Sequence, residues 1–273
     1  MNLRECKLNI EAAWDNRSLL SNPSTQEAIK TIIAGLDAGK IRVADCKNAS
    51  WIVNTWVKKS VILYFLISEM QVINNGPFEY FDKIPLKQNF KEQGIRVVPQ
   101  ALARYGAFME PGVILMPSYV NIGAYIGKDS LIDTWATIGS CAQIGQRVHV
   151  SGGVGIGGVL EPVQAAPVII EDDCFIGSRC IIVEGVRIGK EAVLAANVSI
   201  TQSTKIIDVS GSKPIYHRGY VPPRSVVIPG SYSREYPAGN FQVSAALIIG
   251  KRKASTNKKT SLNDALRTFE IIA

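Results

Sequence analysis

The fold can be predicted from residues 112–158, GVILMPSYVNIGAYIGKDSLIDTWATIGSCAQIGQRVHVSGGVGIGG. A β-branched residue recurs in it at every sixth position, and the series comprises Ile114, Val120, Ile126, Ile132, Ile138, Ile144, Val150 and Ile156. A small or medium-sized residue stands two positions before each of them. A period of six fits neither a helix nor simple strand alternation. It indicates a solenoid in which each hexad forms one flat side and points its β-branched residue inward.

The repeat is interrupted once and then resumes, with inward positions predicted at Ile170, Ile176, Ile182, Ile188, Leu194, Ile200, Val221 and Val227. Between Ile156 and Ile170 the step is 14 residues, so eight residues beyond one hexad are inserted within residues 157–168. Three hexads per turn would give coils stacked roughly 4.8 Å apart, the spacing of adjacent strands. The period does not fix the handedness, and the general rule for parallel crossovers favours right-handed winding.

The segment before the repeat is predicted to be an α-rich domain, residues 1–105. Ser24 and Glu27 have the spacing of a capping box, and Gly39 is a natural end for the helix that follows. A second helical pattern covers residues 54–70.

The repeat itself is assigned to residues 106–230, and residues 231–273 are predicted to form a C-terminal strand and helix segment that caps the solenoid. Ser261 and Asp264 have cap spacing, which predicts a helix from Ser261 to about Phe269. Caps at both ends would cover edges that otherwise invite aggregation.

Composition indicates a soluble protein, with 47% apolar and 19% charged residues among 273. The net charge of +7 is not accompanied by any nucleic-acid-binding motif. One basic cluster stands out, made of Lys251, Arg252, Lys253, Lys258 and Lys259. It is either a solvated face or a site for a phosphorylated small ligand.

The cysteine pattern and the N-terminus favour a reducing, cytoplasmic location with no membrane or nucleic-acid partner. The five cysteines form no CxxC pair, so no metal site is predicted. Arg4, Glu5 and Lys7 interrupt any signal sequence, and the longest apolar stretch is too short to span a bilayer.

Residues 115–162 closely resemble the bacterial tetrahydrodipicolinate N-succinyltransferases, above all in DTWATIGSCAQIG. The resemblance extends to GIRVVPQ, YFDKIP, IIEDDCFIGSRC and VPPRSVV, and so to nearly the whole chain. It implies a left-handed parallel β-helix, a homotrimer with active sites shared by two subunits, and an inserted segment that reaches toward the adjacent chain. The implied reaction, in lysine and diaminopimelate biosynthesis, transfers a succinyl group from succinyl-CoA to the amine of ring-opened tetrahydrodipicolinate. The products are N-succinyl-2-amino-6-ketopimelate and CoA, and no tightly bound cofactor is required.

Asp133 is the candidate catalytic residue, because the matching family aspartate lies in the acceptor site as a base or amine anchor. It follows Ile132, which is predicted to point inward, so its side chain should point outward. The alternative interpretation is a turn aspartate that accepts local backbone hydrogen bonds. Arg96 matches an arginine that contacts the acceptor, and its planar guanidinium suits a carboxylate.

The candidate CoA-binding residues are Gly157, Gly158, Lys251 and Lys253. The glycines lie in GGVGIGG, where the backbone could approach the thioester or the pantetheine arm closely. The lysines would meet the phosphates of CoA.

One departure from the family pattern affects the mechanism. Family members commonly carry a second acid after CFIG, whereas this chain has Ile181, with Glu184 as the nearest acid. A mechanism that needs two acids is therefore in doubt. Cys174 and Cys180 occupy small corner positions and are interpreted as packing residues, not nucleophiles.

Three other functions are alternatives to this interpretation. An acetyl-CoA-dependent acyltransferase on the same fold would use His149 as its base. A hexapeptide-type zinc carbonic anhydrase needs three histidines, and the chain has only His149 and His217. A purely structural solenoid would not need Arg96, Asp133 and the insertion together.

Overall fold

The computed structural model describes residues 2–48 and 50–253 of the chain. Helices lie in the N-terminal region: α1 Leu3–Asp15, the short 3₁₀ helix η1 Arg17–Ser21, α2 Pro23–Asp37 and α3 Thr55–Ile67. Two hairpins accompany them, β1 Ala44–Lys47 with β2 Ser50–Val53 and β3 Gln71–Asn75 with β4 Phe78–Asp82. None of the described helices is both long and apolar enough to span a bilayer.

The helix starts differ from the predicted capping box. α2 begins at Pro23 with Asn22 at its N-cap and no capping side chain, so the prediction for Ser24 and Glu27 is wrong. Proline suits the first helical position because its missing N–H has no partner there in any case. The capping box is on α1, where Asn2 and Glu5 bond each other's backbone N–H. The prediction of a helix within residues 54–70 is confirmed by α3.

Residues 96–227 contain three sheets of short parallel strands, each named here after one outward residue. The His149 sheet contains β5 Arg96–Val97, β8 Ile114–Leu115, β11 Leu131–Ile132, β14 His149–Val150, β17 Phe175–Ile176, β20 Val193–Leu194 and the first part of β25 Ser225–Tyr236. The Ile181 sheet contains β6 Leu102–Ala103, β9 Tyr119–Val120, β12 Thr137–Ile138, β15 Gly155–Ile156, β18 Ile181–Ile182 and β21 Ser199–Ile200. The Tyr125 sheet contains β7 Phe108–Met109, β10 Tyr125–Ile126, β13 Gln143–Ile144, β16 Ile169–Ile170, β19 Arg187–Ile188 and β24 Tyr220–Val221.

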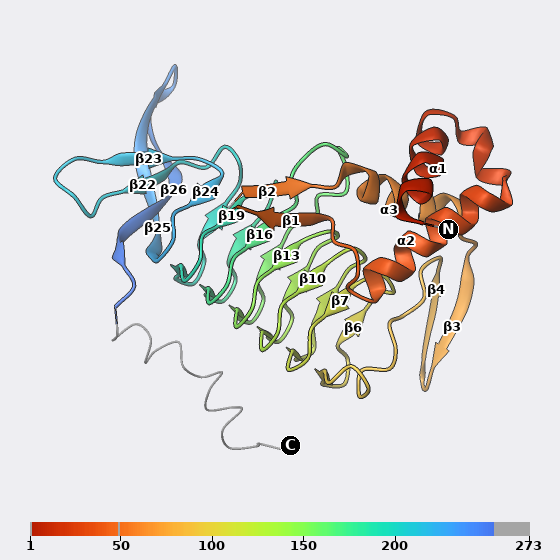
Figure 1. The fold of residues 1–273 in the computed structure, drawn as a ribbon. Helices are drawn as coiled ribbons and strands as arrows, with labels where there is room; N and C mark the ends of the chain where they lie inside the picture. Colours follow the sequence, from red (N-terminus) through yellow and green to blue (C-terminus); the bar gives the residue numbers. More distant parts are fainter. Residues whose placement is uncertain (1, 49, 254–273) are drawn as a thin grey trace.

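Successive strands pass through the three sheets in rotation, which is the strand order expected of a parallel β-helix. From β5 to β21 the parallel pairs join strands three places apart along the chain, as β11 does with β8 and β14. After the excursion that separates β21 from β24, β19 pairs with β24 and β20 with β25. Figure 1 shows these coils stacked in a row, with α1–α3 near the end where they begin and β25 and β26 Gly239–Lys251 at the other end. The parallel ladders already include Arg96 and Leu102, which precede the predicted start of the repeat at residue 106.

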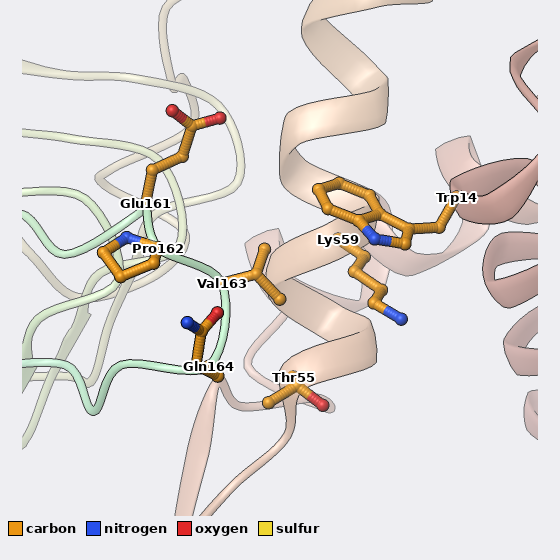
Figure 2. Close-up of a pocket in the computed structure, with 7 residues that line it drawn as sticks. All are labelled: Trp14, Thr55, Lys59, Glu161, Pro162, Val163 and Gln164. Atoms are coloured by element: carbon orange, nitrogen blue, oxygen red, sulfur yellow. The ribbon is translucent and has the colours of Figure 1, made fainter.

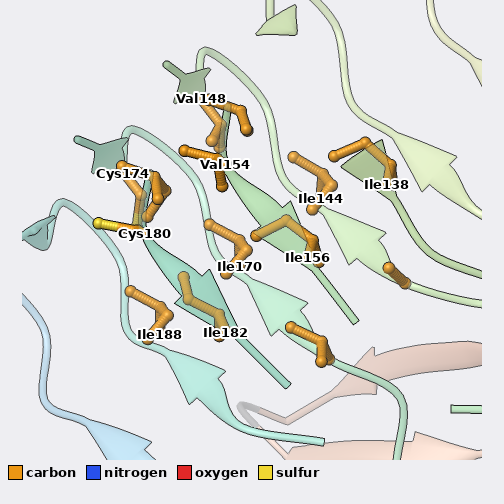
Figure 3. Packing of buried hydrophobic residues seen from close by; sticks show 14 of the residues in the cluster. Ile138, Ile144, Val148, Val154, Ile156, Ile170, Cys174, Cys180, Ile182 and Ile188 are labelled. Atoms are coloured by element: carbon orange, nitrogen blue, oxygen red, sulfur yellow. The ribbon is translucent and has the colours of Figure 1, made fainter. Parts of the chain in front are cut away.

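The predicted inward positions form one continuous core, and Figure 3 shows part of it. From Val120 to Val227 every predicted hexad residue is buried, as are most of the small residues two positions earlier. Ile114 is the exception, because Leu115 pairs with Ile132 and points inward while Ile114 is only half-buried. The corner between Leu115 and Val120 is one residue shorter than the others, so the prediction for Ile114 is wrong by one position.

The insertion lies where it was predicted, between β15 and β16. A second excursion separates β21 from β24 and contains β22 Ile206–Asp208 and β23 Ile215–His217. These two strands pair with each other, and β22 also pairs with β26, which in turn pairs with β25. The helix predicted from Ser261 lies outside the described residues.

Candidate active site

Asp133 lies directly after β11, at the corner where the chain passes from the His149 sheet to the Ile181 sheet. Its Oδ1 accepts hydrogen bonds from the backbone N–H of Thr134 at 2.6 Å and from the Thr134 hydroxyl at 3.1 Å. Its backbone N–H donates to the Val150 carbonyl at 2.8 Å, so the coil fixes its position. The side chain is half-buried, and no cation in the described part of the chain pairs with it. The site therefore offers a carboxylate with one oxygen held by a local turn.

Trp135 follows at the same corner and was not identified from the sequence. It adopts a left-handed backbone conformation, with φ of 61°, and 67% of the residue is exposed. It lines a cavity of about 370 Å³ whose other walls include Tyr80, Phe90 and Gln100. The DTW string marks this corner in the sequence, but the sequence does not show whether the tryptophan side chain points inward or outward.

Arg96 lies on the same sheet as Asp133 but does not contact it. Arg96 is exposed on β5 and pairs with Ile114, which pairs in turn with Leu131. The strand of Arg96, β5, is therefore two strand spacings, or roughly 10 Å, from β11, which precedes Asp133. Both side chains belong to the described residues, and no ion pair joins them.

The basic cluster lies toward the other end of the coils. Lys251 is exposed at the end of β26, and its Nζ donates to the Pro223 carbonyl at 3.1 Å. Lys253 is also exposed, while Arg252 donates to the Asp173 carbonyl at 2.5 Å. Strand β25, which pairs with β26 beside Lys251, is four strand positions from β11, or roughly 19 Å. Lys258 and Lys259 lie outside the described residues.

Gly157 and Gly158 occupy the corner after β15, where neighbouring coils approach closely. A Cβ on Gly158 would lie 2.6 Å from the Ser140 nitrogen, and one on Gly157 would lie 2.8 Å from Cγ1 of Val183. Coil packing alone therefore requires glycine at both positions. The N–H of Gly157 donates to the Ile182 carbonyl at 2.8 Å, so it already forms a hydrogen bond between neighbouring strands.

His149 is enclosed between neighbouring strands. Only 5% of the residue is exposed, and its ring centroid lies 4.8 Å from that of Phe175. A general base must reach the proton that it removes, so this burial favours a packing role for His149.

The cysteines at the coil corners are buried, as predicted. Cys174 and Cys180 are 1% and 0% exposed, and their thiols donate to the Gly189 and Ala195 carbonyls. Burial raises the pKa of Cys174, and it raises the pKa of Cys180 to about 11. Neither thiol would be an effective nucleophile at neutral pH. Among residues 2–48 and 50–253, no group of three or more His, Cys, Asp or Glu could hold a metal ion.

The row of outward residues on the Ile181 sheet carries no carboxylate. Ile181 is 41% exposed and lies between Gly155 and Ser199 on the adjacent strands. Glu184 is the nearest acid in sequence. Its carboxylate accepts a hydrogen bond from the backbone N–H of Gln202 at 3.1 Å and so stabilises the corner of the adjacent coil. Among residues 2–48 and 50–253, the outward row of this sheet therefore gives Asp133 no acidic partner.

The inserted segment packs on the N-terminal helices of its own chain. Lys58, on α3, is completely buried, and its Nζ donates to the carbonyls of Pro162 at 3.2 Å and Ala165 at 2.8 Å. A cavity of about 750 Å³ lies beside this contact, between residues 161–164 of the segment and Trp14 and Lys59 (Figure 2). Lys58 ties the insertion to the helices through a cation and two carbonyl oxygens.

Comparison with known proteins gives two matching family models and several close relatives. The model described as tetrahydrodipicolinate N-succinyltransferase N-terminal matches residues 5–67, and the model described as hexapeptide repeat of succinyl-transferase matches residues 167–202. The 2,3,4,5-tetrahydropyridine-2,6-dicarboxylate N-succinyltransferase of Polynucleobacter asymbioticus is 49% identical, over 94% of this chain and 97% of the relative. The protein of that name from the Wolbachia of Brugia malayi is 48% identical, over 98% of this chain and 100% of the relative.

Proposed function

The chain belongs to the tetrahydrodipicolinate N-succinyltransferase family, and on that premise we propose that it transfers the succinyl group of succinyl-CoA to the amine of ring-opened tetrahydrodipicolinate. The products are N-succinyl-2-amino-6-ketopimelate and CoA, and the reaction belongs to lysine and diaminopimelate biosynthesis. The observation that carries the residue-level proposal is the Asp133 carboxylate, fixed by Thr134 at the corner that also carries the exposed Trp135.

Asp133 acts on the reacting amine. A protonated amine has no lone pair, so the acceptor's ammonium must lose a proton before it attacks the thioester carbon. Asp133 takes that proton and the new N–C bond forms. As the C–S bond breaks, the nitrogen's second proton passes to the leaving thiolate of CoA, and Asp133 returns its own proton to solvent. Ile181 and Glu184 supply no second acid on this face, so one carboxylate performs the step.

Arg96 holds the acceptor's distant carboxylate. Its guanidinium can bind a carboxylate through two parallel hydrogen bonds. The roughly 10 Å between the strands of Arg96 and Asp133 is of the order of the length of an extended seven-carbon dicarboxylic acid. The two residues therefore take opposite ends of the acceptor.

The donor lies along the coils, with its phosphates at Lys251 and Lys253 and its thioester near Asp133. An extended acyl-CoA can cover the roughly 19 Å between these strands. Gly157 and Gly158 would contribute only backbone to the donor site, because a Cβ at either position would meet the neighbouring coil.

The assembly is a homotrimer of left-handed β-helices in the cytoplasm, with active sites between subunits. Exposed apolar groups at Trp135 and Ile181 support a neighbouring copy on this flank. The domain division into residues 1–105, 106–230 and 231–273 is part of the same proposal.

An assay of CoA release tests the function. The purified protein is supplied with succinyl-CoA or acetyl-CoA, each with and without 2-aminopimelate as acceptor. We expect acceptor-dependent release with succinyl-CoA that exceeds release with acetyl-CoA at least tenfold. Equal or faster release with acetyl-CoA would favour the histidine-dependent acyltransferase, and failure to bind either donor would favour a structural solenoid.

A further inference from the structure

A second cavity lies on a different flank, between the β1–β2 hairpin and the Tyr125 sheet. Its volume is about 620 Å³, within the usual range for small-molecule sites. One wall is formed by Trp51 of the hairpin and by Arg42, which lies two residues before β1. The coils contribute Tyr125, Lys190 and Tyr220. Figure 1 shows the hairpin lying across the coils, with its far end beside β19 and β24. Pro223 also lines the cavity and accepts the hydrogen bond of Lys251, so the cavity adjoins the proposed donor site without including its lysines. The proposed reaction uses none of these residues.

The carboxylates that line this cavity already accept hydrogen bonds from the protein. Glu110 accepts from the Tyr125 hydroxyl at 2.6 Å and from the N–H of Lys128 at 2.7 Å. Glu171 accepts from the Trp51 indole at 3.1 Å and from Nε of Arg187 at 2.7 Å.

Asp172 is the third carboxylate, and its Oδ1 accepts from the Gln146 N–H at 2.9 Å. Glu110 and Glu171 therefore serve chiefly to hold the walls together, and Asp172 is fixed through one of its two oxygens.

Two of the three lining cations are not matched in this way. Arg42 donates from Nε to Gln143 at 3.1 Å, and its guanidinium lies 3.6 Å from the centre of the Tyr125 ring. No carboxylate of the described residues lies within 4 Å of it, and its terminal nitrogens have no hydrogen-bond partner there. Burial lowers the pKa of Arg42, but an arginine keeps its charge at neutral pH. Lys190 is exposed, and its ammonium likewise forms no ion pair with any described residue.

The remaining walls are aromatic. Trp51, Tyr125 and Tyr220 are each half-buried, and the Trp51 ring is held by its bond to Glu171. Aromatic faces provide a surface against which a flat group packs favourably.

We propose that this cavity binds a small organic anion, whose carboxylate or phosphate meets Arg42 and Lys190 and whose planar body packs against the aromatic walls. A ligand there would contact both the hairpin and the coils, and would stabilise the N-terminal region on the Tyr125 sheet. The inference does not depend on the proposed acyl transfer.

Calorimetric titration of the whole protein tests the site, with benzoate and AMP as probes of the two anion classes and inorganic phosphate as the anion without a planar body. We expect one of the two planar anions to bind at least tenfold more tightly than phosphate. Arg42→Gln should weaken that binding roughly tenfold or more, because a charged hydrogen bond inside a cavity is lost. Lys190→Gln, at an exposed position that does not affect folding, should weaken it about threefold. Lys47→Gln is the matched control, since it makes the same charge change on the same hairpin outside the cavity.

Three results would overturn the proposal. The first is that neither planar anion binds below about 10 mM, the range of weak nonspecific contacts. The second is that the Lys190→Gln variant and a folded Arg42→Gln variant both bind as tightly as the Lys47→Gln control. The third is that AMP binding is lost in Lys251→Gln and kept in Arg42→Gln, which would assign it to the donor site.

Discussion

The outer faces of the Tyr125 sheet and the Ile181 sheet share one core but differ in what covers them. On the Tyr125 sheet Gln143 is completely buried, and Arg42 of the N-terminal region contacts Gln143 and Tyr125. Trp51 donates to Glu171 at the corner that follows β16.

On the Ile181 sheet Ile181 is 41% exposed, and Thr137 is also exposed. The inward hexad residues are equivalent on both sheets, so they cannot cause this difference. The N-terminal region covers the outward residues of the Tyr125 sheet, whereas on the Ile181 sheet it reaches only the first strands, at Leu102 and Tyr119, and leaves Thr137 and Ile181 exposed.

The largest expected effect is on the core that both flanks share. Ile138→Lys would place an unpaired charge where the side chain is completely buried, and should cost about 4 kcal/mol or more of unfolding free energy. Thr137→Lys, the exposed neighbour on the same strand, should change it by about 0.5 kcal/mol or less. Urea unfolding of both variants measures the contrast. A soluble Ile138→Lys variant with a normal midpoint would contradict the assigned register.

A smaller effect is expected where the insertion meets the helices. Lys58→Met removes the cation that holds the Pro162 and Ala165 carbonyls, so the insertion should open more often. Hydrogen exchange at the Ala165 amide, which donates to the Pro162 carbonyl, should become roughly tenfold faster. Lys30→Met, at an exposed position of α2, is the control. Equal exchange in the two variants would show that Lys58 does not hold the segment.

The Arg96→Lys substitution should weaken binding of the acceptor without slowing turnover. Lysine keeps the charge but loses the two-pronged contact, so the Michaelis constant for the acceptor should rise about three- to tenfold while turnover stays within about twofold. Steady-state kinetics with varied acceptor measures both, and Arg218→Lys, another exposed arginine, is the control. A fall in turnover with an unchanged Michaelis constant would assign Arg96 to the transition state instead.

The smallest effect is expected at the centre of the open flank. Ile181→Glu replaces a side chain that is 41% exposed in the single chain, so the unfolding free energy of the dissociated chain should change by about 0.5 kcal/mol or less. Because one carboxylate suffices in the proposed mechanism, turnover should not rise. A tenfold increase in turnover would show that the site is deficient in an acid and would contradict the single-acid mechanism.

The repeat could be predicted because its chemistry is local and periodic. Each hexad needs a β-branched residue inside and a small one at the corner, and the sequence carries both signals from Val120 to Ile200. Ile114 was misassigned because Ile114 and Leu115 are both apolar, and a corner that is one residue short leaves no mark in composition. The start of α2 was misassigned because Asn22 with Pro23 and Ser24 with Glu27 are both acceptable starts, and packing chose between them.

The candidate site could be predicted only in part. The position of Asp133 after an inward residue follows from the period, but its hydrogen bonds to Thr134 do not. The tertiary roles of Lys58 and Arg42 could not be foreseen, because their contacts, at Pro162 and Tyr125, lie far away in the sequence. A lysine within an apolar helical pattern is usually interpreted as solvated, and only the packed structure shows that Lys58 is buried.

The central claim, that Asp133 accepts the proton of the reacting amine, is tested most directly by the turnover of Asp133→Asn beside that of His149→Gln, with succinyl-CoA and 2-aminopimelate. Asparagine keeps the shape and can still accept from Thr134, but it is far too weak a base to take up the proton. Turnover should fall by roughly 10²- to 10⁴-fold in Asp133→Asn, while a folded His149→Gln variant should stay within about tenfold of the parent. Near-normal turnover in Asp133→Asn together with its loss in a folded His149→Gln would contradict the claim and make the histidine the base.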